Sequence, residues 1–496
     1  MRADLVVVGG GTAGCALAAR LVADGGASVV VLEAGPDYGP RGEGRWPADL
    51  LDGGALTASH DWGFTSGPLP GREPIAFQRA RVISGCSAHN GAVAVVGCAE
   101  DYAAWAEVTG DPRWAPEAVR PVLQRVLERL HVRVYGPDEL SPFHGAALRA
   151  AAELGWPRAD DLHVLDGGIG YGVEPVNVRD GVRWNTAFAY LDDVRTRPGL
   201  TVVGDVLVDR VEVGRDGVTV KGVRGGEELS VAADRVVLSA GTFGTPAVLL
   251  RSGIGDPSDL ARLGIPVVHA LPGVGRNLHD HPMVELELAG TPELTRMLAD
   301  ARAQRFVPEE QTLGKLRSSL AAGPYDLHVM PVAAYAQSVL GGRTLIAAAA
   351  LEPRSRGAVE LRSRDPAVLP VVEHAFLTDE GGHDLAVLRE GVALARELAA
   401  AEPLRSLVGP ETVPGGDDDL DQAIRRLVTH YFHPVGTCAM GRAGDPAAVC
   451  DGAGRLHGLE RVTVADCSLF PVVPRANTNV PAVLAGEIVA NALLSR

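Results

Sequence analysis

The chain has 496 residues, which is too many for one compact core, so we expect two or more domains. Its 46% hydrophobic and 22% charged content is typical of a globular protein and excludes a disordered one. The formal net charge of -16 argues against a nucleic-acid-binding surface. A cationic substrate would also fit this charge, although solvated surface carboxylates are the simpler explanation.

The first predicted element is a strand–turn–helix–strand unit at the N-terminus. The apolar run Leu5–Val8 leads into a glycine-rich turn and an Ala-rich helical segment, and the β-branched run Val29–Leu32 ends at Glu33. Glu33 lies nineteen residues after Gly14, close to the roughly 20-residue offset of a carboxylate that accepts from a ribose hydroxyl. The unit therefore predicts a dinucleotide-binding site.

Each glycine of this turn has its own mechanical reason. Gly9 permits the tight turn, Gly11 lets the backbone approach a pyrophosphate, and Gly14 lets the helix pack closely on the strand. The helix N-terminus adds unpaired N–H groups and a partial positive charge for phosphates. The alternative is an ordinary turn that binds nothing, and the spacing fits FAD and nicotinamide dinucleotides alike.

The stretch after Glu33 combines loops with candidate cofactor contacts. Residues 34–56 are rich in Gly and Pro and predict a loop with a short helical piece. Trp62 is either a wall for a flat cofactor or a buried structural residue. Small residues come in series before His89 and Asn90, which lets the backbone approach a bulky group.

Helices and strands then alternate along the middle of the chain. Helical spacing predicts helices within Asp101–Leu130, in two pieces with the second starting at Pro116, and over Ala146–Leu154 and Arg183–Val194. Alternating or buried runs predict strands over Leu200–Val213, Val218–Val223 and Arg235–Ser239, with Asp216 and Gly217 as the hairpin turn between the first two. The last strand and the helix after it return the chain to the first sheet.

A Gly- and Pro-rich loop before residue 283 carries His279, Asp280 and His281 in a row. We do not expect a metal there, because adjacent side chains of an extended loop cannot all face one point. From residue 283 to about 409, polar helices alternate with strands such as Leu345–Leu351 and no phosphate-type glycine turn occurs. This region is the predicted substrate-covering domain.

The C-terminal segment holds the remaining candidates. A short strand, Val462–Ala465, leads to Asp466, and the helix Pro481–Leu494 begins just behind Asn477 and Asn479. His433 follows an aromatic residue and, taken alone, would as readily be structural as catalytic.

Several motifs occur together along the chain. They are the N-terminal glycine turn, RVISGCSAHNGAVAV, SAGTFGTPAVLLRSGIG, LPGVGRNLHDHP, FHPVGTCAMG and ADCSLFP followed by NTNVP. Together they resemble the glucose–methanol–choline (GMC) family of FAD-dependent oxidoreductases, and GCSAHN is most similar to its choline oxidase-like members. The resemblance implies an α/β fold with a Rossmann-like FAD-binding domain over 1–155, 186–282 and 430–496. A substrate domain of β-sheet and helices is implied over 156–185 and 283–429.

The resemblance also implies which residues bind FAD. The implied cofactor residues are Gly9, Gly11, Thr12, Ala13, Gly14, Glu33, Ala34, Trp62, Arg81, Gly85, Cys86, His89, Asn90, Val93, Val208, Asp466, Asn477 and Thr478. In choline oxidase-like members a histidine at the position of His89 is joined covalently to the flavin, so His89 is a candidate for covalent attachment. A non-covalent polar contact to the ring is the alternative.

The catalytic pair that the resemblance implies is His433 and Asn477. Oxidising an alcohol removes a hydroxyl proton and a hydride, and a histidine with a pKa of about 6.5 takes the proton near neutral pH. The Asn477 amide cannot titrate, but it donates to the same oxygen and orients it. The flavin accepts the hydride.

This chain departs from choline oxidase at several positions. Gly91 stands where choline oxidase has Ser, and Phe432 where it has Tyr before the catalytic His. Its cation-binding Glu has no clear counterpart, although Glu285 and Glu287 lie in the right neighbourhood. Choline itself is therefore not the predicted substrate. His328 is either a pocket-facing or a satisfied core residue.

The predicted function is FAD-dependent oxidation of a small-molecule alcohol, with a primary alcohol expected, to an aldehyde or ketone, with O2 or another acceptor reoxidising FAD. The alternatives are a non-redox lyase of the same fold, of the hydroxynitrile lyase type, and an NAD-dependent enzyme that uses the glycine turn alone. Six scattered cysteines, no signal peptide and no membrane-length apolar run predict a cytoplasmic protein, and an oligomer is compatible with the sequence.

Overall fold

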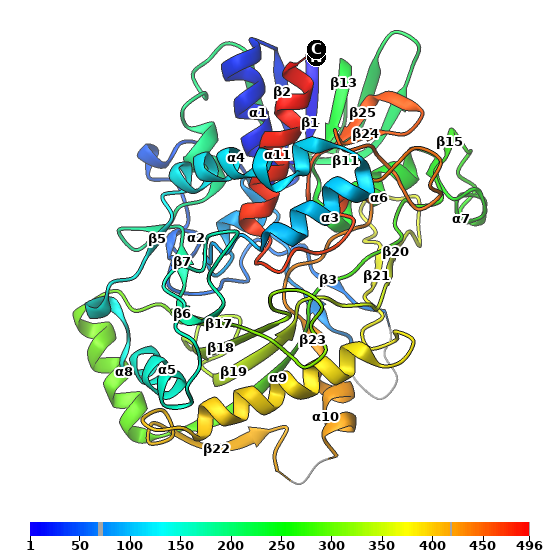
Figure 1. The fold of residues 1–496 in the computed structure, drawn as a ribbon. Coiled ribbons are helices and arrows are strands. Elements are labelled where there is room, and N and C mark those ends of the chain that lie inside the picture. The colour runs from blue at the N-terminus through cyan, green and yellow to red at the C-terminus, as the bar shows by residue number, and fades with distance from the viewer. Residues whose placement is uncertain (68–72, 417–418, 496) are drawn as a thin grey trace.

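The computed structural model describes residues 1–67, 73–416 and 419–495, which form two large β-sheets with helices packed on each (Figure 1). The first sheet has the strand order β10-β2-β1-β13-β12-β11, and β25 and β24 lie beside β13. The strands β10, β2, β1, β13 and β25 run parallel, whereas β11 and β12 form an antiparallel hairpin against β13. The bounds are β1 Arg2–Val8, β2 Val29–Leu32, β10 Leu200–Val203, β11 Val206–Val213, β12 Val218–Arg224, β13 Glu227–Leu238, β24 Arg455–Leu456 and β25 Leu459–Val464.

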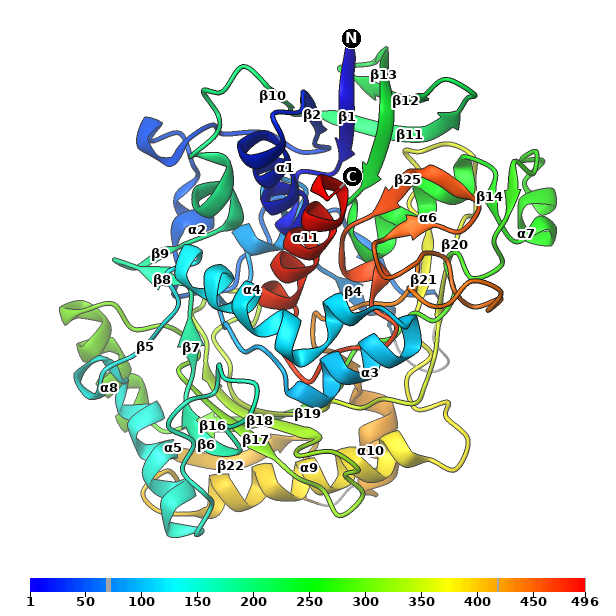
Figure 2. The same ribbon diagram turned by 45° about the horizontal axis from the view of Figure 1, so that its top comes forward.

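The central strands of this sheet are covered on both faces. All four residues of β2 are buried, and the run of three valines that ends β1 is buried as well. Continuous apolar runs are what a parallel sheet between two helical layers requires. The helices α1 (Thr12–Gly25) and α11 (Asn479–Leu494) lie side by side on one face, joined by an ion pair between Arg20 and Glu487 (Figures 1 and 2).

The second sheet is antiparallel, with the order β22-β16-β19-β18-β17-β6 and β23 beside β16. Its side chains alternate between two cores: Leu327 and Val329 of β18 pack on the outer side with α9, whereas Met330 and Val332 face inward. Its strands are β6 Gly170–Val173, β16 Pro282–Gly290, β17 Thr312–Leu316, β18 Leu327–Ala333, β19 Thr344–Ala350, β22 Val408–Val413 and β23 Thr429–His430.

The other helices and small strands complete the architecture. The helices are α2 Ala48–Leu51, α3 Ala99–Thr109, α4 Pro116–Arg129, α5 Pro142–Glu153, α6 Gly241–Arg251, α7 Pro257–Arg262, α8 Pro292–Gln304, α9 His383–Ala400 and α10 Leu420–Leu427. The paired short strands are β3 Phe64–Thr65 with β4 Ala76–Phe77, β5 Arg133–Val134 with β7 Pro175–Val176, β8 Val178–Arg179 with β9 Val182–Arg183, β14 Ile254–Gly255 with β15 His269–Ala270, and β20 Ala358–Glu360 with β21 Val371–Glu373.

Most predicted elements are confirmed. The N-terminal strand–helix–strand unit, the helix that starts at Pro116 and the hairpin at Gly217 form as expected, and β13 returns to the first sheet beside β1. The helix predicted over Ala146–Leu154 begins four residues earlier, at Pro142, after Ser141 caps its N-terminus through the His144 N–H.

Two predictions need correction. The helix predicted over Arg183–Val194 is wrong for its first turn, and only Ala187–Leu191 is helical, as a π-turn. Arg183 instead ends β9, and its buried guanidinium donates to five main-chain carbonyls, those of Asn90, Asp49, Leu50, Ala88 and Ala55. The strand predicted over Leu200–Val213 is broken at Asp205, which adopts a left-handed φ of 59° and sends β11 away from β2.

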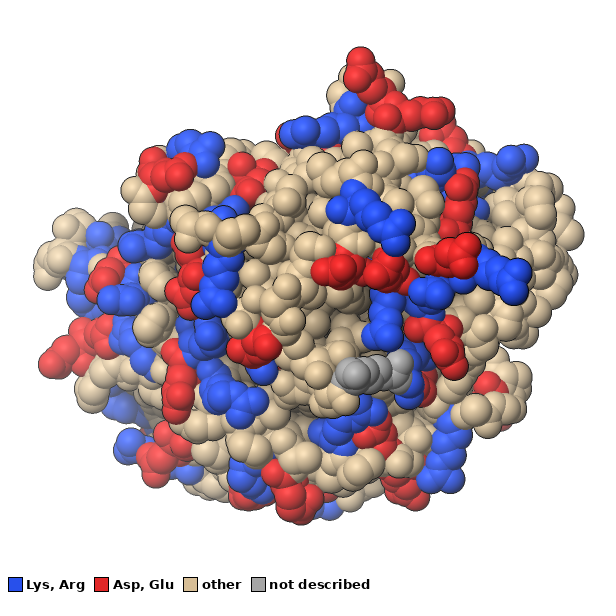
Figure 3. Space-filling view, turned by 90° about the horizontal axis from the view of Figure 1, so that it is seen from above, with Lys and Arg blue, Asp and Glu red and all other residues tan. Residues whose placement is uncertain are grey.

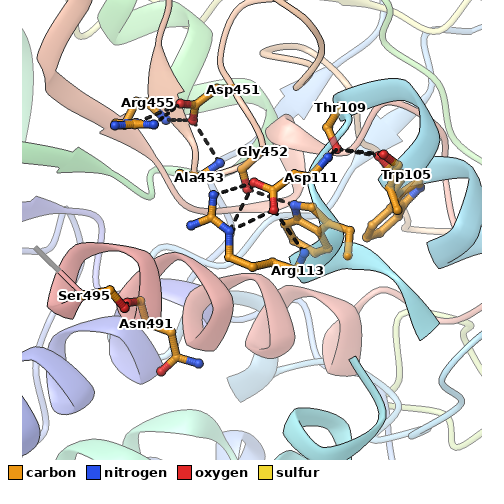
Figure 4. A network of polar contacts seen from close by, with 12 residues as sticks. Trp105, Thr109, Asp111, Arg113, Asp451, Gly452, Ala453, Arg455, Asn491 and Ser495 are labelled. Carbon is orange, nitrogen blue, oxygen red and sulfur yellow. Dashed lines mark hydrogen bonds and ion pairs between the residues drawn. The ribbon is translucent and has the colours of Figure 1, made fainter. Parts of the chain in front are cut away.

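Long-range contacts hold the C-terminal segment against the residues between α3 and α4. Figure 4 shows Asp111 and Arg113, between α3 and α4, against the loop at Gly452. The indole N–H of Trp114 donates to the Gly452 carbonyl at 2.8 Å, and a Cβ at Gly452 would lie 2.5 Å from Asp111. This packing fixes the loop that leads into β24 and β25, and so the strand that ends just before Asp466.

The acidic side chains of the surface lie among basic ones. On the face in Figure 3, Lys and Arg are interspersed with Asp and Glu, and many acidic side chains form ion pairs with arginine, for example Asp421 with Arg389. Among the described residues no helix is both long and apolar enough to cross a membrane. The predicted domain boundaries stay a prediction, although β6, from the predicted 156–185 piece, does pair with β17 of the second sheet.

Candidate active site

One long cavity runs between the two sheets, from the glycine turn to the inner face of the second sheet. It brings together most of the predicted site residues. These lining residues are Gly9, Gly11, Thr12, Ala13, Glu33, Ala34, Trp62, Gly85, Cys86, His89, Asn90, Val93, Val208, His433, Asp466, Asn477 and Thr478. Gly14 and Arg81 are the two predicted residues that do not line it.

The three glycines of the first turn differ in what a side chain would meet. Gly9 has a φ of 97°, and a Cβ there would lie 2.3 Å from the Ser239 carbonyl oxygen. A Cβ at Gly14 would lie 2.1 Å from the Gly9 oxygen, so Gly14 serves helix packing. At Gly11 the nearest protein atoms would be 3.9 Å away, so the protein itself does not require glycine there. The open space over Gly11 belongs to the cavity and fits a bound ligand.

Two buried carboxylates brace this half of the cavity. Glu33 accepts hydrogen bonds from the N–H groups of Gly10 (2.9 Å) and Gly35 (2.8 Å), and burial raises its pKa to about 7 against these bonds. Asp466 accepts from the Gly241 N–H and the Thr245 hydroxyl at 2.9 and 2.6 Å. Both carboxylates therefore hold glycine turns in place at the edge of the sheet.

The segment that carries His89 has an unusual backbone. Ser84, Gly85 and Ala92 all adopt left-handed φ values, of 78°, 54° and 59°. His89 is 5% exposed, and its Nε2 has no hydrogen-bond partner among the described residues. Burial lowers the pKa of His89 to about 3, so its imidazole is neutral. A buried neutral imidazole with a free nitrogen fits a group that a ligand completes.

His433 lies three residues beyond β23 and is held from two sides. Its main-chain N–H donates to both oxygens of Asp280 at 3.1 Å, and its Nδ1 lies 3.1 Å from Nδ1 of His281. Burial, reinforced by His281, holds the pKa of His433 well below its ordinary value, so the ring is neutral at pH 7. In the described chain the ring bonds through Nδ1, which leaves Nε2 for the cavity.

The three adjacent side chains of the loop His279–His281 do not all face one point, as the sequence predicts. His279 points away: its Nδ1 lies 2.7 Å from the Asn277 oxygen, and its Nε2 accepts from the Val473 N–H. Asp280 and His281, however, converge with the distant His433, and their potential ligand atoms lie within 4.8 Å of one another. The sequence does not indicate this second grouping, because His433 lies 152 residues after His281. The polar atoms of this grouping already bond one another, and a metal ion would have to break those bonds.

Asn477 lines the same cavity as His433 and lies just before the N-terminus of α11. Its Oδ1 is buried without a partner among the described residues, and the same is true of both polar side-chain atoms of Asn479. The hydroxyl of Tyr431, which also lines the cavity, lies within reach of Asn477. Unpartnered buried amides of this kind point to a missing ligand.

Of the two arginines in the RAR motif, Arg79 lines the cavity and the predicted Arg81 does not. Arg81 is exposed, packs its guanidinium over the Trp62 ring at 4.8 Å and donates to the Ala34 carbonyl. The Nη1 of Arg79 donates to the Phe432 carbonyl at 3.0 Å, next to His433, and Phe432 has a φ of 64°. Residues two apart in an extended segment share one face, so alternation alone does not distinguish the two arginines.

Comparisons with known proteins agree with this geometry. Two models of the GMC oxidoreductase family match residues 3–283 and 353–486. The mitochondrial choline dehydrogenase of Mus musculus is 32% identical, over 98% of this chain and 88% of its own length. An oxygen-dependent choline dehydrogenase of Brucella anthropi is 32% identical over 100% and 96%. The crystal structure of pyridoxine 4-oxidase from Mesorbium loti superposes with a TM-score of 0.87 at 27% identity, covering 99% of each chain.

The fold and the cavity define an FAD-dependent oxidoreductase that acts on CH–OH donors. The chain belongs to the GMC oxidoreductase family. Its residues fit FAD: the open space over Gly11, the braced turn at Glu33 and the free Nε2 of His89 all line one continuous cavity. The alternative of a nicotinamide enzyme that uses the glycine turn alone is not supported.

Proposed function

We propose that the protein oxidises an alcohol to an aldehyde or ketone with His433 as the base and Asn477 as its partner. The observation that carries the proposal is the shared cavity. The glycine turn, His89, His433 and Asn477 come from four separated segments and all line it. The lyase alternative receives no support from the relatives described above.

The proposed chemistry follows from the state of each side chain. His433 is neutral because burial depresses its pKa, so its Nε2 can take the hydroxyl proton of the substrate. Asp280 anchors the His433 backbone, and its negative charge favours the imidazolium that forms. Asn477 offers an amide that donates to the developing alkoxide.

FAD, when bound, supplies the hydride acceptor. The residues proposed to hold it are the predicted set without Gly14 and Arg81, and with Arg79 added. His89 is the proposed point of covalent attachment, supported by its buried, neutral ring with an unpartnered Nε2. Acid precipitation followed by mass spectrometry tests the attachment: flavin that comes free in the supernatant excludes it.

Anaerobic mixing of the purified flavoprotein with a panel of alcohols tests the oxidation. Bleaching of the flavin absorbance band by at least one alcohol is expected. A panel that leaves the band unchanged, while a cyanohydrin is cleaved, would instead establish the lyase. Repetition under air separates O2 from other acceptors.

The remaining assignments rest on less specific observations. Because the Brucella anthropi relative is an oxygen-dependent choline dehydrogenase, O2 is the proposed acceptor to test first. A cytoplasmic location is supported by the six cysteines, all of which are free thiols. The division into a FAD-binding and a substrate domain, with the boundaries given above, is kept as proposed, and a native mass measurement determines the oligomeric state.

A further inference from the structure

The cavity contains a carboxyl group that the proposed chemistry does not use. Glu310, just before β17, lines the cavity together with Tyr431 and His433. Its Oε2 lies 3.6 Å from the position a Cβ would take at Gly91, two residues after His89. The absent side chain at Gly91 therefore leaves the Glu310 carboxyl facing open space beside the segment that carries His89.

Its neighbour in the sequence, Glu309, is in contrast a carboxylate whose oxygens accept hydrogen bonds from the protein. Glu309 accepts from the main-chain N–H groups of Leu56 and Tyr335 at 3.1 and 2.6 Å, and from the Ser338 hydroxyl at 3.0 Å. It thereby fixes two loops of the cavity wall. The side chain of Glu310 receives no hydrogen bond from the residues that the structure describes.

A second buried carboxyl lies behind Glu310. Glu174 follows β6, and its N–H donates to the Gln311 carbonyl at 2.9 Å, which places residues 174 and 310 on neighbouring strand ends. Glu174 is 1% exposed, and its Oε2 lacks a partner in the described chain. Glu310 is half-buried at the cavity wall, and Glu174 is buried outside the lining, so only Glu310 faces the cavity itself.

No positive charge of the described chain compensates this pair. Burial raises the pKa of Glu310 to about 8 with a contribution from Glu309, and burial raises the pKa of Glu174 with a contribution from Glu310. Glu285, also in the cavity, differs: Arg343 donates to it at 2.6 Å, and the same Nη1 reaches Glu287 at 2.7 Å. Neither of these two predicted cation-binding candidates is therefore free.

A buried carboxyl group without a partner is stable in two ways: it keeps its proton, or a cation binds and pairs with it. The carboxyl oxygens of Glu310 and Glu174 have neither an N–H donor nor a positive charge beside them among the described residues. A primary or secondary ammonium group supplies both, whereas a quaternary ammonium has no N–H to donate. Glu310 shares the cavity lining with Tyr431, whose ring centroid lies 4.3 Å from that of His433.

We infer that the substrate is an amino alcohol whose protonated primary or secondary amine binds Glu310, with Glu174 behind it, while its hydroxyl reaches His433. This inference rests on the proposed alcohol oxidation and names the substrate class of that site. It assigns Glu310 the specificity-determining contact and gives Glu174 the role of holding the negative charge in place.

The test compares straight-chain amino alcohols, from ethanolamine to aminohexanol, with n-alkanols of equal heavy-atom count and with choline. For the amino alcohol of best length, kcat/KM should exceed that of its n-alkanol by about tenfold or more, the value of one charge-assisted hydrogen bond. Glu310→Gln should remove that preference, so that kcat/KM of the amino alcohol and of its n-alkanol, measured with the same variant, become equal within about twofold. Glu285→Gln is the matched control and should keep the preference, because Glu285 is already paired with Arg343.

Calorimetric titration of the flavoprotein with n-butylamine gives a second readout that needs no turnover. Binding to the wild type and its loss in Glu310→Gln are expected, with tetramethylammonium binding more weakly. Equal oxidation of n-alkanols and amino alcohols, or a preference that survives Glu310→Gln, would overturn the inference and leave the proposed oxidation intact. If no alcohol of either class reduces the flavin, the proposed oxidation is contradicted, and so is the amine subsite that rests on it.

Discussion

The two walls of the cavity treat their buried carboxyls in opposite ways. On the wall of the first sheet, Glu33 and Asp466 accept hydrogen bonds from neighbouring main-chain N–H groups. On the wall of the second sheet, Glu310 and Glu174 accept no side-chain hydrogen bond from the described residues. An unsatisfied buried acceptor costs free energy, so the carboxyls of the first wall need no ligand, whereas those of the second wall gain from one. The fold itself thus satisfies the carboxyls of the cofactor half, and the proposed amine would satisfy those of the substrate half.

The largest effect is expected from a substitution that removes the base and leaves the carboxyls of both walls unchanged. His433→Ala should slow anaerobic flavin reduction by about 100- to 10,000-fold, because general-base catalysis contributes that much. FAD content, measured from the absorbance ratio, should stay unchanged, since Asp280 binds the main chain at this position and not the ring. Unchanged reduction kinetics would remove His433 from the mechanism.

Asn477 should matter next. Asn477→Leu removes the amide donor at nearly the same volume and should lower the flavin reduction rate by about 100-fold or more, as the loss of an oxyanion donor does. Asn477→His restores an N–H donor and should recover part of that loss. If the leucine and histidine variants reduce flavin equally fast, the amide does not donate to the substrate oxygen.

Substitutions in the glycine turn sharpen the contrast on the first wall. Gly11→Ala should fold normally and bind FAD at least about tenfold more weakly, because its Cβ occupies space that the protein leaves open. Gly14→Ala should instead lower the thermal midpoint of the apoprotein, since its Cβ meets the Gly9 oxygen at 2.1 Å. Flavin titration and thermal unfolding of the apoproteins separate the two. Equal FAD affinity of Gly11→Ala and the wild type would contradict a pyrophosphate over Gly11.

The smallest effect concerns the framework of the second wall. Lys315 in β17 is fully buried, donates to the Leu162 carbonyl at 2.8 Å, and burial lowers its pKa to about 8 from an ordinary 10.5. The folded state therefore binds fewer protons than the unfolded state between these values, and stability rises with pH across that window. The shift corresponds to about 3 kcal/mol at most.

Thermal midpoints of the wild type and Lys315→Met, compared from pH 7 to 10.5, isolate this contribution. The wild type should gain on the variant as the pH rises above about 8. Lys221→Met, whose side chain in β12 is half-exposed, is the control and should track the wild type. If the difference in thermal midpoint between the wild type and Lys315→Met stays constant over this pH range, burial does not lower the pKa of Lys315.

The two walls also differ in how far the sequence predicts them. The glycine turn and Glu33 could be recognised because they are close together in the sequence. Each glycine of the turn also has one steric reason to lack a side chain. Glu310 could not, because a Glu pair before a strand has the same appearance whether it is solvated or buried. Only the pairing of β6 with β17 brings Glu174 to it. Arg183 shows the same limit: its carbonyl partners lie up to 134 residues away along the chain and override local helical spacing.

The most direct measurement is a crystal structure of the protein loaded with FAD. The account predicts a flavin ring in contact with His89 on one side and with His433 and Asn477 on the other, and with Gly11 beneath the pyrophosphate. A ring bound elsewhere, with these side chains distant from it, would contradict the account, and so would a protein that takes up no FAD.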